Sequence, residues 1–541
     1  MDAGHHGLRS RQEGGICDGY RRYSSYDPHP ALLVVSRPRD RRRGTGGTIK
    51  PPLLTGQYSG YTADQLRAYR SHDRHTDVYA RMRTIAVALT DAEIAGQAAH
   101  YGGGLSLTAL ASITWRSKAM LSAKHREIVS ATVPALRAHG EAITRRFYGD
   151  MFTAHPELYN LFNPANQRDG GQARSLAASV LAYAEHIEHP ERLGTMVERI
   201  SNKHGSLQVK PGHYPIVGKY LLGAITAVLG PAATPDILEA WGAAYGQLAD
   251  IMIGREEAIE SGDAARPGGW RGFKPFRIER KVAESEATTS FYLVPDDGAP
   301  LPAFEPGQYL SVRVHPPGFP YRQIRQYSVS CAPNDRHYRI SVKREDAPPN
   351  EPSAPSGLVS NYLQHAAREG DMLPVHMPLG DFTLTEGDHP VVLLSGGAGI
   401  TAVLSMLEHL AGPEGGTREV VFLHAARGRA HHAFAEHVRA LGRQRPGIRI
   451  SVLYEEAGRD DVPGTHHDAV GLITAEVVRR HLSEREAEFY YCGPLGFMAA
   501  VEGALDDLGV PLERRHSEAF APDPSFAAGA PVPAPQARPT A

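Results

Sequence analysis

Apolar residues recur at intervals of three and four through much of the chain, and other patterns replace this one after residue 268. Residues 119–262 consist of consecutive segments with helical spacing, short breaks and almost no strand pattern. One of these segments places an apolar stripe and a histidine on a single helix face, formed by Leu193, Met196, Val197, Ile200 and His204. Gly205 is expected to let the chain leave this helix, and Pro211 to discourage its renewal. The pattern predicts an all-α domain with His204 near the end of a helix.

A second apolar stripe in the same region ends in a carboxylate. It continues at helical spacing from Trp241 through Met252 to Glu256. A bare carboxylate at that position would be costly, so we expect a hydrogen-bonding partner for it. The alternative is an ordinary surface glutamate beside Arg255.

The period changes to alternation at Gly268. Short β-rich runs separated by turns follow, with the sequences GFKPFRIERKVAESEATTSFYLVP, PGQYLSVRV, IRQYSVSCAP and YRISVKRE. This pattern predicts a small antiparallel barrel.

Strands and helices alternate from His389 onward. The run PVVLLSGGAGITAVLSMLEHL has the pattern of a buried strand, a glycine turn and a helix, and further strands follow in EVVFLHAAR, IRISVLYEE and AEFYYCGPLGFM. Continuous apolar strands with intervening helices predict a parallel sheet covered on both faces. The predicted fold class is therefore multidomain: an all-α domain, an antiparallel β-barrel and an α/β parallel-sheet domain.

The two ends of the chain have different compositions from the rest. Residues 1–50 hold ten Lys or Arg against five Asp or Glu, which predicts a disordered basic N-terminus; an arm that touches nucleic acid is the alternative. Residues 104–118 are expected to be a linker. Residues 523–541, rich in Pro and Ala, are expected to be a disordered tail.

Composition sets limits on the location and on the classes of partner. The chain has 541 residues, of which 41% are hydrophobic and 22% charged, and its formal net charge is −2. These values are ordinary for soluble globular proteins, and the overall charge does not indicate binding to nucleic acid or to a membrane surface. The three cysteines, Cys17, Cys331 and Cys492, are too few and scattered for a disulfide framework. No uncharged apolar run approaches the roughly 18 residues of a membrane span, and the polar start does not resemble a signal peptide. We expect a cytoplasmic protein without a membrane span.

Residues 51–103 carry helical spacing and resemble the C-terminal half of a class I c-type cytochrome, in which Met82 would be an axial ligand. That family attaches haem through Cys-x-x-Cys-His, whereas Cys17 is followed here by Asp-Gly-Tyr. The segment is therefore interpreted as a cytochrome-like helical remnant without its haem. A small helical pair with an ordinary methionine is the alternative.

Almost all of residues 119–522 resembles a flavohaemoglobin, with residues 119–262 as its globin domain. The resemblance rests on the segment from Lys124 through FYGDMF and LFNPAN to the helix after it, and on the histidine segment above. It implies that His204 is the proximal iron ligand and Tyr148 the distal tyrosine; without His204, Tyr148 would be interpreted as a packing aromatic. The pocket neighbours and the partners of the proximal imidazole that it implies are Phe162, Gln172, Leu176, Tyr214 and Glu256.

Residues 263–386 are similar to the FAD-binding barrel of ferredoxin-reductase-like flavoproteins. The Arg-x-Tyr-Ser motif of that family stands here as Arg325, Gln326, Tyr327 and Ser328, and Tyr309 in PGQY is the other expected flavin contact. A guanidinium suits a pyrophosphate, a phenol packs on a flavin ring, and a hydroxyl can bond its reactive edge. The insertion at residues 346–356 is expected to be a flexible loop. It precedes residues 357–361, which lie near the FAD diphosphate in the family.

Residues 387–522 resemble the NAD(P)-binding half of the same reductases. Gly396, Gly397 and Gly399 are expected to let backbone N–H groups approach a phosphate. Two departures from the family are Ala402, where a proline is common, and Ala521, where a glycine is common; they are expected to loosen the helix start and to crowd the flavin. The cofactor-binding residues that the resemblance implies here are Gly397, Ala398, Gly399, Ile400, Thr401, Ala402, Cys492, Gly493, Pro494, Glu518, Ala519, Phe520, Ala521 and Pro522.

The resemblance implies a nitric oxide dioxygenase with one non-covalent haem b, FAD and NAD(P)H. Electrons would pass from NAD(P)H through FAD to the haem, and dioxygen would oxidise nitric oxide to nitrate. A monomer with dioxygen and nitric oxide as its small-molecule substrates is expected. Two alternatives remain: a haem-based gas-binding or sensing protein with a reductase domain, and a haem-independent NAD(P)H reductase of quinones, flavins or cytochromes.

Overall fold

In the computed structural model the chain consists of two units, Met1–Thr114 and Trp115–Ala541. It describes residue 67 and residues 121–163, 170–347, 353–481 and 487–520. The predictions for the basic N-terminus, the linker, the Pro- and Ala-rich tail and, apart from residue 67, the cytochrome-like segment with Met82 therefore lie outside the described residues. Cys17 and part of the 346–356 insertion lie outside them too.

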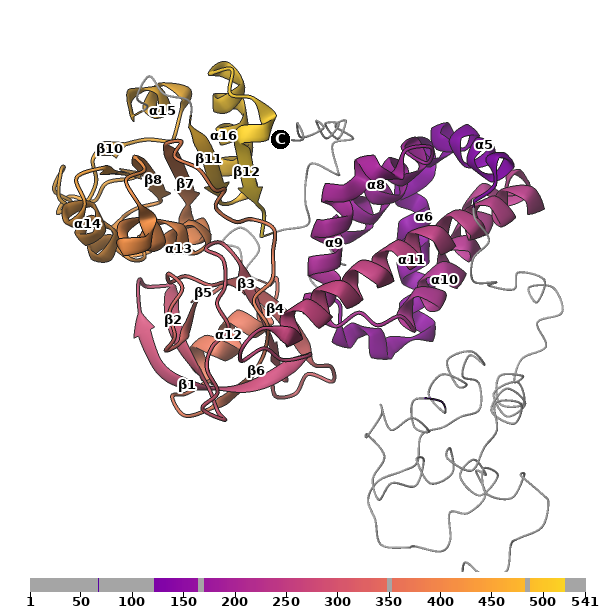
Figure 1. Ribbon diagram of the computed structural model, residues 1–541, viewed down its shortest axis with the longest axis horizontal. Coiled ribbons are helices and arrows are strands. Elements are labelled where there is room, and N and C mark those ends of the chain that lie inside the picture. The colour runs from indigo at the N-terminus through magenta and orange to yellow at the C-terminus, as the bar shows by residue number, and fades with distance from the viewer. Residues whose placement is uncertain (1–66, 68–120, 164–169, 348–352, 482–486, 521–541) are drawn as a thin grey trace, which may run out of the picture. The chain divides into compact units, whose positions relative to one another are not determined.

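The first domain of the second unit is helical, as the periodicity predicts (Figure 1). Among the described residues up to 265, no strand is formed. The elements in chain order are α5 (Ala123–Ala131), α6 (Val133–Ala154), η2 (Pro156–Asn160), α8 (Gly171–Glu185), η3 (Pro190–Leu193), α9 (Gly194–Leu207), α10 (His213–Leu229), η4 (Gly230–Ala232) and α11 (Pro235–Ala265).

Large rings from three helices fill the helical core and have their polar atoms satisfied. Phe147 of α6, Tyr183 of α8 and Trp241 of α11 are almost fully buried. The Tyr183 hydroxyl donates to the carbonyl of Ala244 at 2.9 Å, and the Trp241 indole donates to the Thr132 hydroxyl at 3.1 Å. Burial of these rings therefore stabilises the fold without leaving unpaired donors.

The end of α9 differs from the sequence prediction. The helix does not end at Gly205 but continues to Leu207, and Gln208 takes the left-handed conformation (φ 58°) that ends it. The amides of Gln208 and Val209 then bond back to the carbonyls of Gly205 and His204. The prediction was wrong because a single glycine weakens a helix without ending it, and contacts elsewhere hold this turn in place.

Helix α10 is the most apolar helix of this domain. By length and composition alone, the segment His213–Ala232 could cross a membrane. In the structure α10 packs against α6 and α11, and its buried Leu221, Ala224 and Ile225 belong to the core cluster of the helical domain. We therefore interpret it as a core helix.

An antiparallel barrel follows the helices. Its strands are β1 (Phe273–Ala283), β2 (Thr288–Pro295), β3 (Tyr309–Val314), β4 (Gln323–Ser328), β5 (Tyr338–Lys343) and β6 (Met372–His376), with α12 (Leu358–His365) between the last two. The strand order is β4-β3-β6-β1-β2-β5, and a bridge between Val329 and Ile340 joins the two edges. Both of these residues are fully buried. The barrel encloses its own apolar core, and β3 and β4, which carry the predicted flavin motifs, pair in it.

The last domain is a six-stranded sheet with the order β10-β9-β8-β7-β11-β12, and all its pairs are parallel. Helices α13 and α14 cover one face and α15 and α16 the other (Figure 1). The fold class predicted from the sequence is thus confirmed. The elements are β7 (Val391–Gly396), η5 (Gly397–Gly399), α13 (Ile400–Ala411), η6 (Pro413–Gly415), β8 (Val420–Ala426), η7 (Arg429–His431), α14 (Ala435–Gln444), β9 (Ile448–Tyr454), β10 (Ala469–Val470), α15 (Ala475–His481), β11 (Glu488–Cys492), α16 (Leu495–Asp507), η8 (Leu512–Arg514) and β12 (Arg515–Glu518).

One buried carboxylate ties the barrel to the parallel-sheet domain. Glu408 of α13 pairs with Arg339 of β5 at 2.7 Å and accepts from the backbone amide of Ala332 at 2.9 Å and from His437 at 2.7 Å. The side chains of Glu408 and Arg339 are only 14% and 9% exposed. Because every polar partner is satisfied, this contact fixes the glycine-turn helix against the barrel.

Candidate functional site

A hydrogen-bonded trio surrounds His204 in the last turn of α9. Its Nδ1 lies 2.8 Å from Oε1 of Glu256 on α11 and 3.2 Å from the hydroxyl of Tyr214 on α10. The Tyr214 hydroxyl donates to the same Glu256 oxygen at 2.5 Å. Because a carboxylate only accepts, we assign the imidazole proton to Nδ1. Nε2 makes no hydrogen bond within the described part of the chain, so its lone pair is available to a metal ion.

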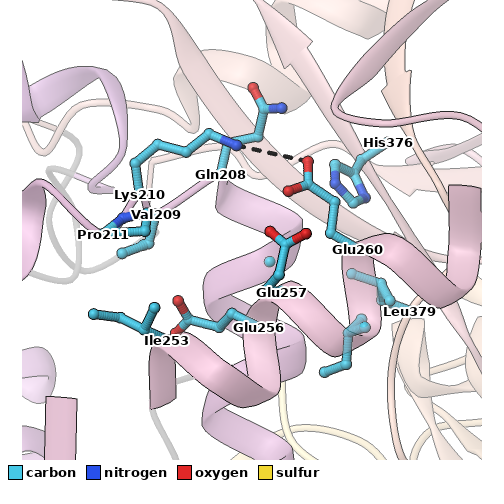
Figure 2. A pocket seen from close by; sticks show the side chains of 12 residues that line it. Gln208, Val209, Lys210, Pro211, Ile253, Glu256, Glu257, Glu260, His376 and Leu379 are labelled. Carbon is cyan, nitrogen blue, oxygen red and sulfur yellow. Dashed lines mark ion pairs between the residues drawn. The ribbon is translucent and has the colours of Figure 1, made fainter. Parts of the chain in front are cut away.

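Glu256 is buried, not a surface glutamate. It is 7% exposed, and among the described residues its only ion-pair partner is His204. The two nearby cations pair elsewhere: Arg255 with Glu198 at 2.6 Å, and Lys210 with Glu260 at 3.6 Å. Figure 2 shows the pocket beside this site, with Lys210 reaching across to Glu260 and Glu256 outside that pair. The charge of Glu256 therefore acts on the imidazole.

The hydroxyl of Tyr214 stays protonated. Burial raises its pKa above the usual value, and the hydrogen bond and the negative charge of Glu256 raise it further. A second tyrosine, Tyr245, donates to the carbonyl of Tyr214 at 2.8 Å and so fixes the start of α10 against α11. The partner expected for Glu256 from the sequence is thus present, and it comes from a different helix.

Tyr148 of α6, the tyrosine expected on the distal side, is buried in the helical domain. It is 8% exposed, and its hydroxyl is hydrogen-bonded to Gln172 of α8. Burial raises the pKa of Tyr148, against the lowering effect of Gln172, so the phenol is neutral. Its ring packs edge-on against Phe162, with the centroids 6.0 Å apart. Leu176 follows Gln172 by one helical turn and packs against the same core.

The residues of this region fit a haem. Besides a free imidazole nitrogen, a haem needs apolar walls. Several apolar side chains of the helical domain are only partly buried although they pack on its core, among them Phe162, Leu176, Val180, Val197 and Ile200. Partly exposed apolar side chains that pack on a core suit contact with a large apolar group. The donor set and the walls both suit haem.

Arg325 on β4 provides a site for an anion. Its guanidinium donates to the carbonyl of Ile324 at 2.8 Å and to the side-chain oxygens of Asn163 at 2.9 Å and Gln323 at 3.2 Å. These partners are neutral, and no carboxylate pairs with Arg325 within the described part of the chain. Loss of solvent lowers the pKa of Arg325. A desolvated guanidinium without a counter-ion fits the diphosphate of FAD.

The other predicted flavin contacts lie on the same pair of strands. Tyr309 of β3 stands opposite Ser328 of β4, and Gln326 and Tyr327 precede Ser328 on that strand. Burial raises the pKa of Tyr309 and Tyr327, so both phenols are neutral. Gly380 has φ +123°, and a Cβ on it would lie 3.0 Å from the Tyr309 ring. The structure brings the two predicted motifs together beside this glycine.

The glycines of the turn between β7 and α13 allow close packing as well as the approach of a phosphate. A Cβ at Gly399 would lie 1.9 Å from the carbonyl of Cys492, and one at Gly396 would lie 2.8 Å from the ring of Phe497. Only Gly397, with φ +52°, has open space around its Cβ position. Close packing against β11 and α16 is therefore enough to require glycine at positions 396 and 399, although the sequence pattern assigns all three glycines to phosphate binding.

The helix after this turn starts regularly without the proline common in the family. Ile400 begins α13, and the Thr401 hydroxyl donates to the carbonyl of Ala398 at 3.0 Å. Ala402 is fully buried within the helix. The loosened helix start expected from Ala402 is therefore not seen.

Glu518 lies close to both the nicotinamide half and the flavin motif. It ends β12 opposite Cys492, which ends β11 and precedes Gly493 and Pro494. Burial raises the pKa of Cys492 and of Tyr309, and the charge of Glu518 adds to both shifts. Ala519 and the exposed Phe520 follow, whereas Ala521 and Pro522 lie outside the described residues, so crowding by Ala521 stays a prediction.

Three polar residues at this site escape the sequence patterns: Asn163, Asn202 and Ser206. Asn163 bonds Arg325, and Asn202 accepts from the amide of Gly380 at 3.3 Å. The Ser206 hydroxyl accepts from the Gln326 amide at 2.7 Å. No motif marks them, because each acts on a segment more than a hundred residues away.

Two family models match the chain. The model described as "Globin" matches residues 145–252, and the model described as "Oxidoreductase NAD-binding domain" matches residues 393–503. The first match contains His204, Tyr214 and the expected pocket residues Phe162 and Gln172. The second contains the glycine turn and Cys492.

Curated relatives and a solved structure cover three domains together. The chain is 59% identical over 408 residues to a protein named "Flavohemoprotein" from Deinococcus radiodurans, covering 75% of this chain and 99% of the relative. It is 49% identical over 403 residues to a protein of the same name from Bordetella pertussis, covering 74% and 98%. The crystal structure of flavohemoglobin from Malassezia yamatoensis with bound FAD and heme is similar at a TM-score of 0.65 and 29% identity, covering 74% of this chain and 99% of that one.

Proposed function

The chain belongs to the flavohaemoprotein family, and we propose that it is a nitric oxide dioxygenase that uses NAD(P)H, FAD and one non-covalent haem b. In this reaction dioxygen and nitric oxide give nitrate, and each turnover takes one electron. One NAD(P)H therefore supports two turnovers. The observation that carries the proposal is the trio of His204, Glu256 and Tyr214 in one chain with the RQYS flavin motif and the glycine turn.

When bound, haem supplies the iron centre for dioxygen chemistry, and FAD splits a hydride into single electrons. His204 would hold the iron through Nε2, since Nδ1 is bonded to Glu256. The carboxylate makes the imidazole a stronger donor and moves electron density toward the metal. A proximal ligand of this kind favours redox turnover over simple oxygen carriage.

On the distal side, Tyr148 acts as a neutral hydrogen-bond donor, and Gln172 orients its hydroxyl. Preorganised donors stabilise negative charge where it develops during a reaction, because they need no rearrangement at that moment. Tyr148 therefore stabilises the charge that dioxygen acquires as it is consumed. Phe162 and Leu176 keep the surroundings apolar.

The barrel and the parallel sheet provide the reductase half. Arg325 would hold the diphosphate of FAD, Tyr309 and Tyr327 would pack on the flavin ring, and Ser328 would bond its reactive edge. The turn at Gly397 receives the NAD(P)H phosphates at the start of α13. Residues 492–494 and Glu518 flank the hydride path.

We also place this enzyme in the cytoplasm as a monomer. Cys331 and Cys492 are both free and buried, which suits a reducing compartment. Sedimentation at working concentration tests the monomer, and fractionation of the native cells tests the location.

The decisive test follows NADH consumption and nitrate release by protein loaded with haem and FAD, supplied with nitric oxide in air. We expect both to depend on nitric oxide and oxygen, and the haem Soret band to disappear in His204→Ala. Slow turnover with tight ligand retention would instead identify a gas-binding protein. NADH oxidation without a haem spectrum would identify a simple reductase.

A further inference from the structure

One face of α9 docks on the barrel. Arg199, Asn202 and Ser206 are spaced three and four residues apart, so they share a side of the helix. Arg199 pairs with Asp381 at 3.4 Å, and Asn202 accepts from the amide of Gly380. Ser206 is the innermost of the three, with no exposed surface.

The Ser206 hydroxyl is hydrogen-bonded both to its own helix and to the barrel. It donates to the carbonyl of Lys203 at 2.8 Å and accepts from the Gln326 amide at 2.7 Å. These two bonds use its one proton and one of its two lone pairs. The hydroxyl also lies beside Tyr309, whose pKa it lowers. Gln326 and Tyr309 belong to the two separate flavin motifs of the barrel.

His204 lies on the other side of the same helical turn. Two residues along an α-helix turn the side-chain direction by about 200°, so Ser206 and His204 project to nearly opposite sides. The imidazole meets α10 and α11, while the serine meets β3 and β4. A single turn of backbone thus separates the iron ligand from a direct contact with the flavin site.

We propose that Ser206 is a positioning residue for electron transfer from the flavin to the haem. The inference rests on the proposed function. In the step concerned, the reduced flavin loses one electron and the ferric haem gains it; no bond forms or breaks, and the hydride from NAD(P)H supplies two such electrons. Ser206 neither carries the electron nor exchanges a proton in this step. It holds the helix of the iron ligand in register with Tyr309 and Gln326, and so fixes the path between the two cofactors.

Ser206→Ala tests this role in the holoenzyme by stopped flow. Ferric protein is mixed with NADH without oxygen, and flavin bleaching and the Soret change are followed separately. We expect flavin reduction at the wild-type rate, and haem reduction slower by about tenfold or more, because small misplacements of reacting groups reduce rates steeply. Ser201→Ala is the matched control: Ser201 lies on the same helix, is also fully buried, and its hydroxyl faces the sulfur of Met252 at 3.8 Å. Both steps should keep their wild-type rates there.

A second readout does not depend on turnover. Amide hydrogen exchange should become faster in β3, β4 and the last turn of α9 in Ser206→Ala, and stay unchanged there in Ser201→Ala. If Ser206→Ala does not fold, Gln326→Met breaks the contact from the barrel side, and the same slowing of haem reduction is expected. Where both variants fold, combining them should slow haem reduction no further than the slower single change, since they remove one shared contact.

The outcomes separate the two proposals. If wild-type protein reduces its flavin but never its haem, the proposed function fails. If wild-type haem is reduced and Ser206→Ala matches Ser201→Ala in haem reduction and in exchange, the role of Ser206 is overturned while the function stands. Equal slowing of flavin and haem reduction would also overturn it, because the defect would then lie before the transfer.

Discussion

Replacing Glu256 by glutamine should raise the midpoint potential of the haem. The carboxylate accepts two hydrogen bonds through Oε1, from His204 at 2.8 Å and from Tyr214 at 2.5 Å. The amide keeps the shape and can still accept a hydrogen bond, but the negative charge behind the imidazole is lost. That charge stabilises the ferric state more than the ferrous state, because the ferric iron carries one more positive charge.

The size of the shift follows from the strength of the bond to His204. A hydrogen bond to a charged group contributes about 1.5–3 kcal/mol, and for a one-electron couple about 59 mV corresponds to a tenfold change in the equilibrium constant. If the whole loss falls on the ferric state, the potential rises by about 65–130 mV. Loss of a partner behind a metal ligand also lowers activity by about 10- to 100-fold, so nitrate formation should fall in this range.

An anaerobic spectroelectrochemical titration of the Soret band measures this shift. Glu260→Gln is the matched control, because Glu260 lies one turn further along α11 and pairs with Lys210 instead of the histidine. Tyr214→Phe removes a hydrogen bond but leaves the charge, so its shift should be smaller than that of Glu256→Gln. The reasoning is refuted if Glu256→Gln and Glu260→Gln have the same potential.

Three further outcomes are expected. Tyr148→Phe should speed dioxygen dissociation from the ferrous protein by about 10- to 100-fold, the equivalent of one hydrogen bond to a charged acceptor; an unchanged rate in flash photolysis would remove Tyr148 from the distal role. Glu408→Gln should lower the free energy of unfolding by about 3–5 kcal/mol, because it leaves the buried Arg339 without its partner; a loss under about 1 kcal/mol in urea titrations would contradict this. Burial lowers the pKa of His432 to about 4 and that of His424 well below its usual 6.5, so both stay neutral in the folded protein. In the unfolded chain both histidines bind protons below pH 6.5. As the pH is lowered from 6.5 to about 4, the free energy of unfolding should therefore fall by about 1.4 kcal/mol per pH unit for each histidine. The fall should be less steep in His432→Phe.

Much of the fold could be predicted because the patterns that specify it are local. The alternation after Gly268 and the apolar runs after His389 identify strands without any knowledge of their neighbours. A hydrogen-bonding partner for Glu256 could also be predicted, because a carboxylate on an apolar stripe needs one. The pattern alone leaves the identity of that partner open, and here the family resemblance supplied Tyr214.

The end of α9 shows where local patterns fail. Gly205 and Pro211 favour an early stop, but the helix continues to Leu207 and places Ser206 against the barrel. The partner of Ser206 lies 120 residues away in sequence, and Asn163 and Arg325 are 162 residues apart. Such contacts depend on how two folded domains pack against each other. This packing cannot be predicted from hydrophobic spacing or from a short motif.

Gly205 lies two residues before the end of α9 and affects how firmly this end is held. A Cβ there would lie 3.6 Å from Leu379, an ordinary contact, so steric strain does not require the glycine. The glycine does, however, weaken the helix between His204 and Ser206. The bonds of Ser206 offset that weakness, because they hold the turn that the glycine loosens. The stability of this turn and the contact between the two domains therefore depend on each other. A change that unwinds the end of α9 should disturb the positions of the iron ligand and of the flavin motif together.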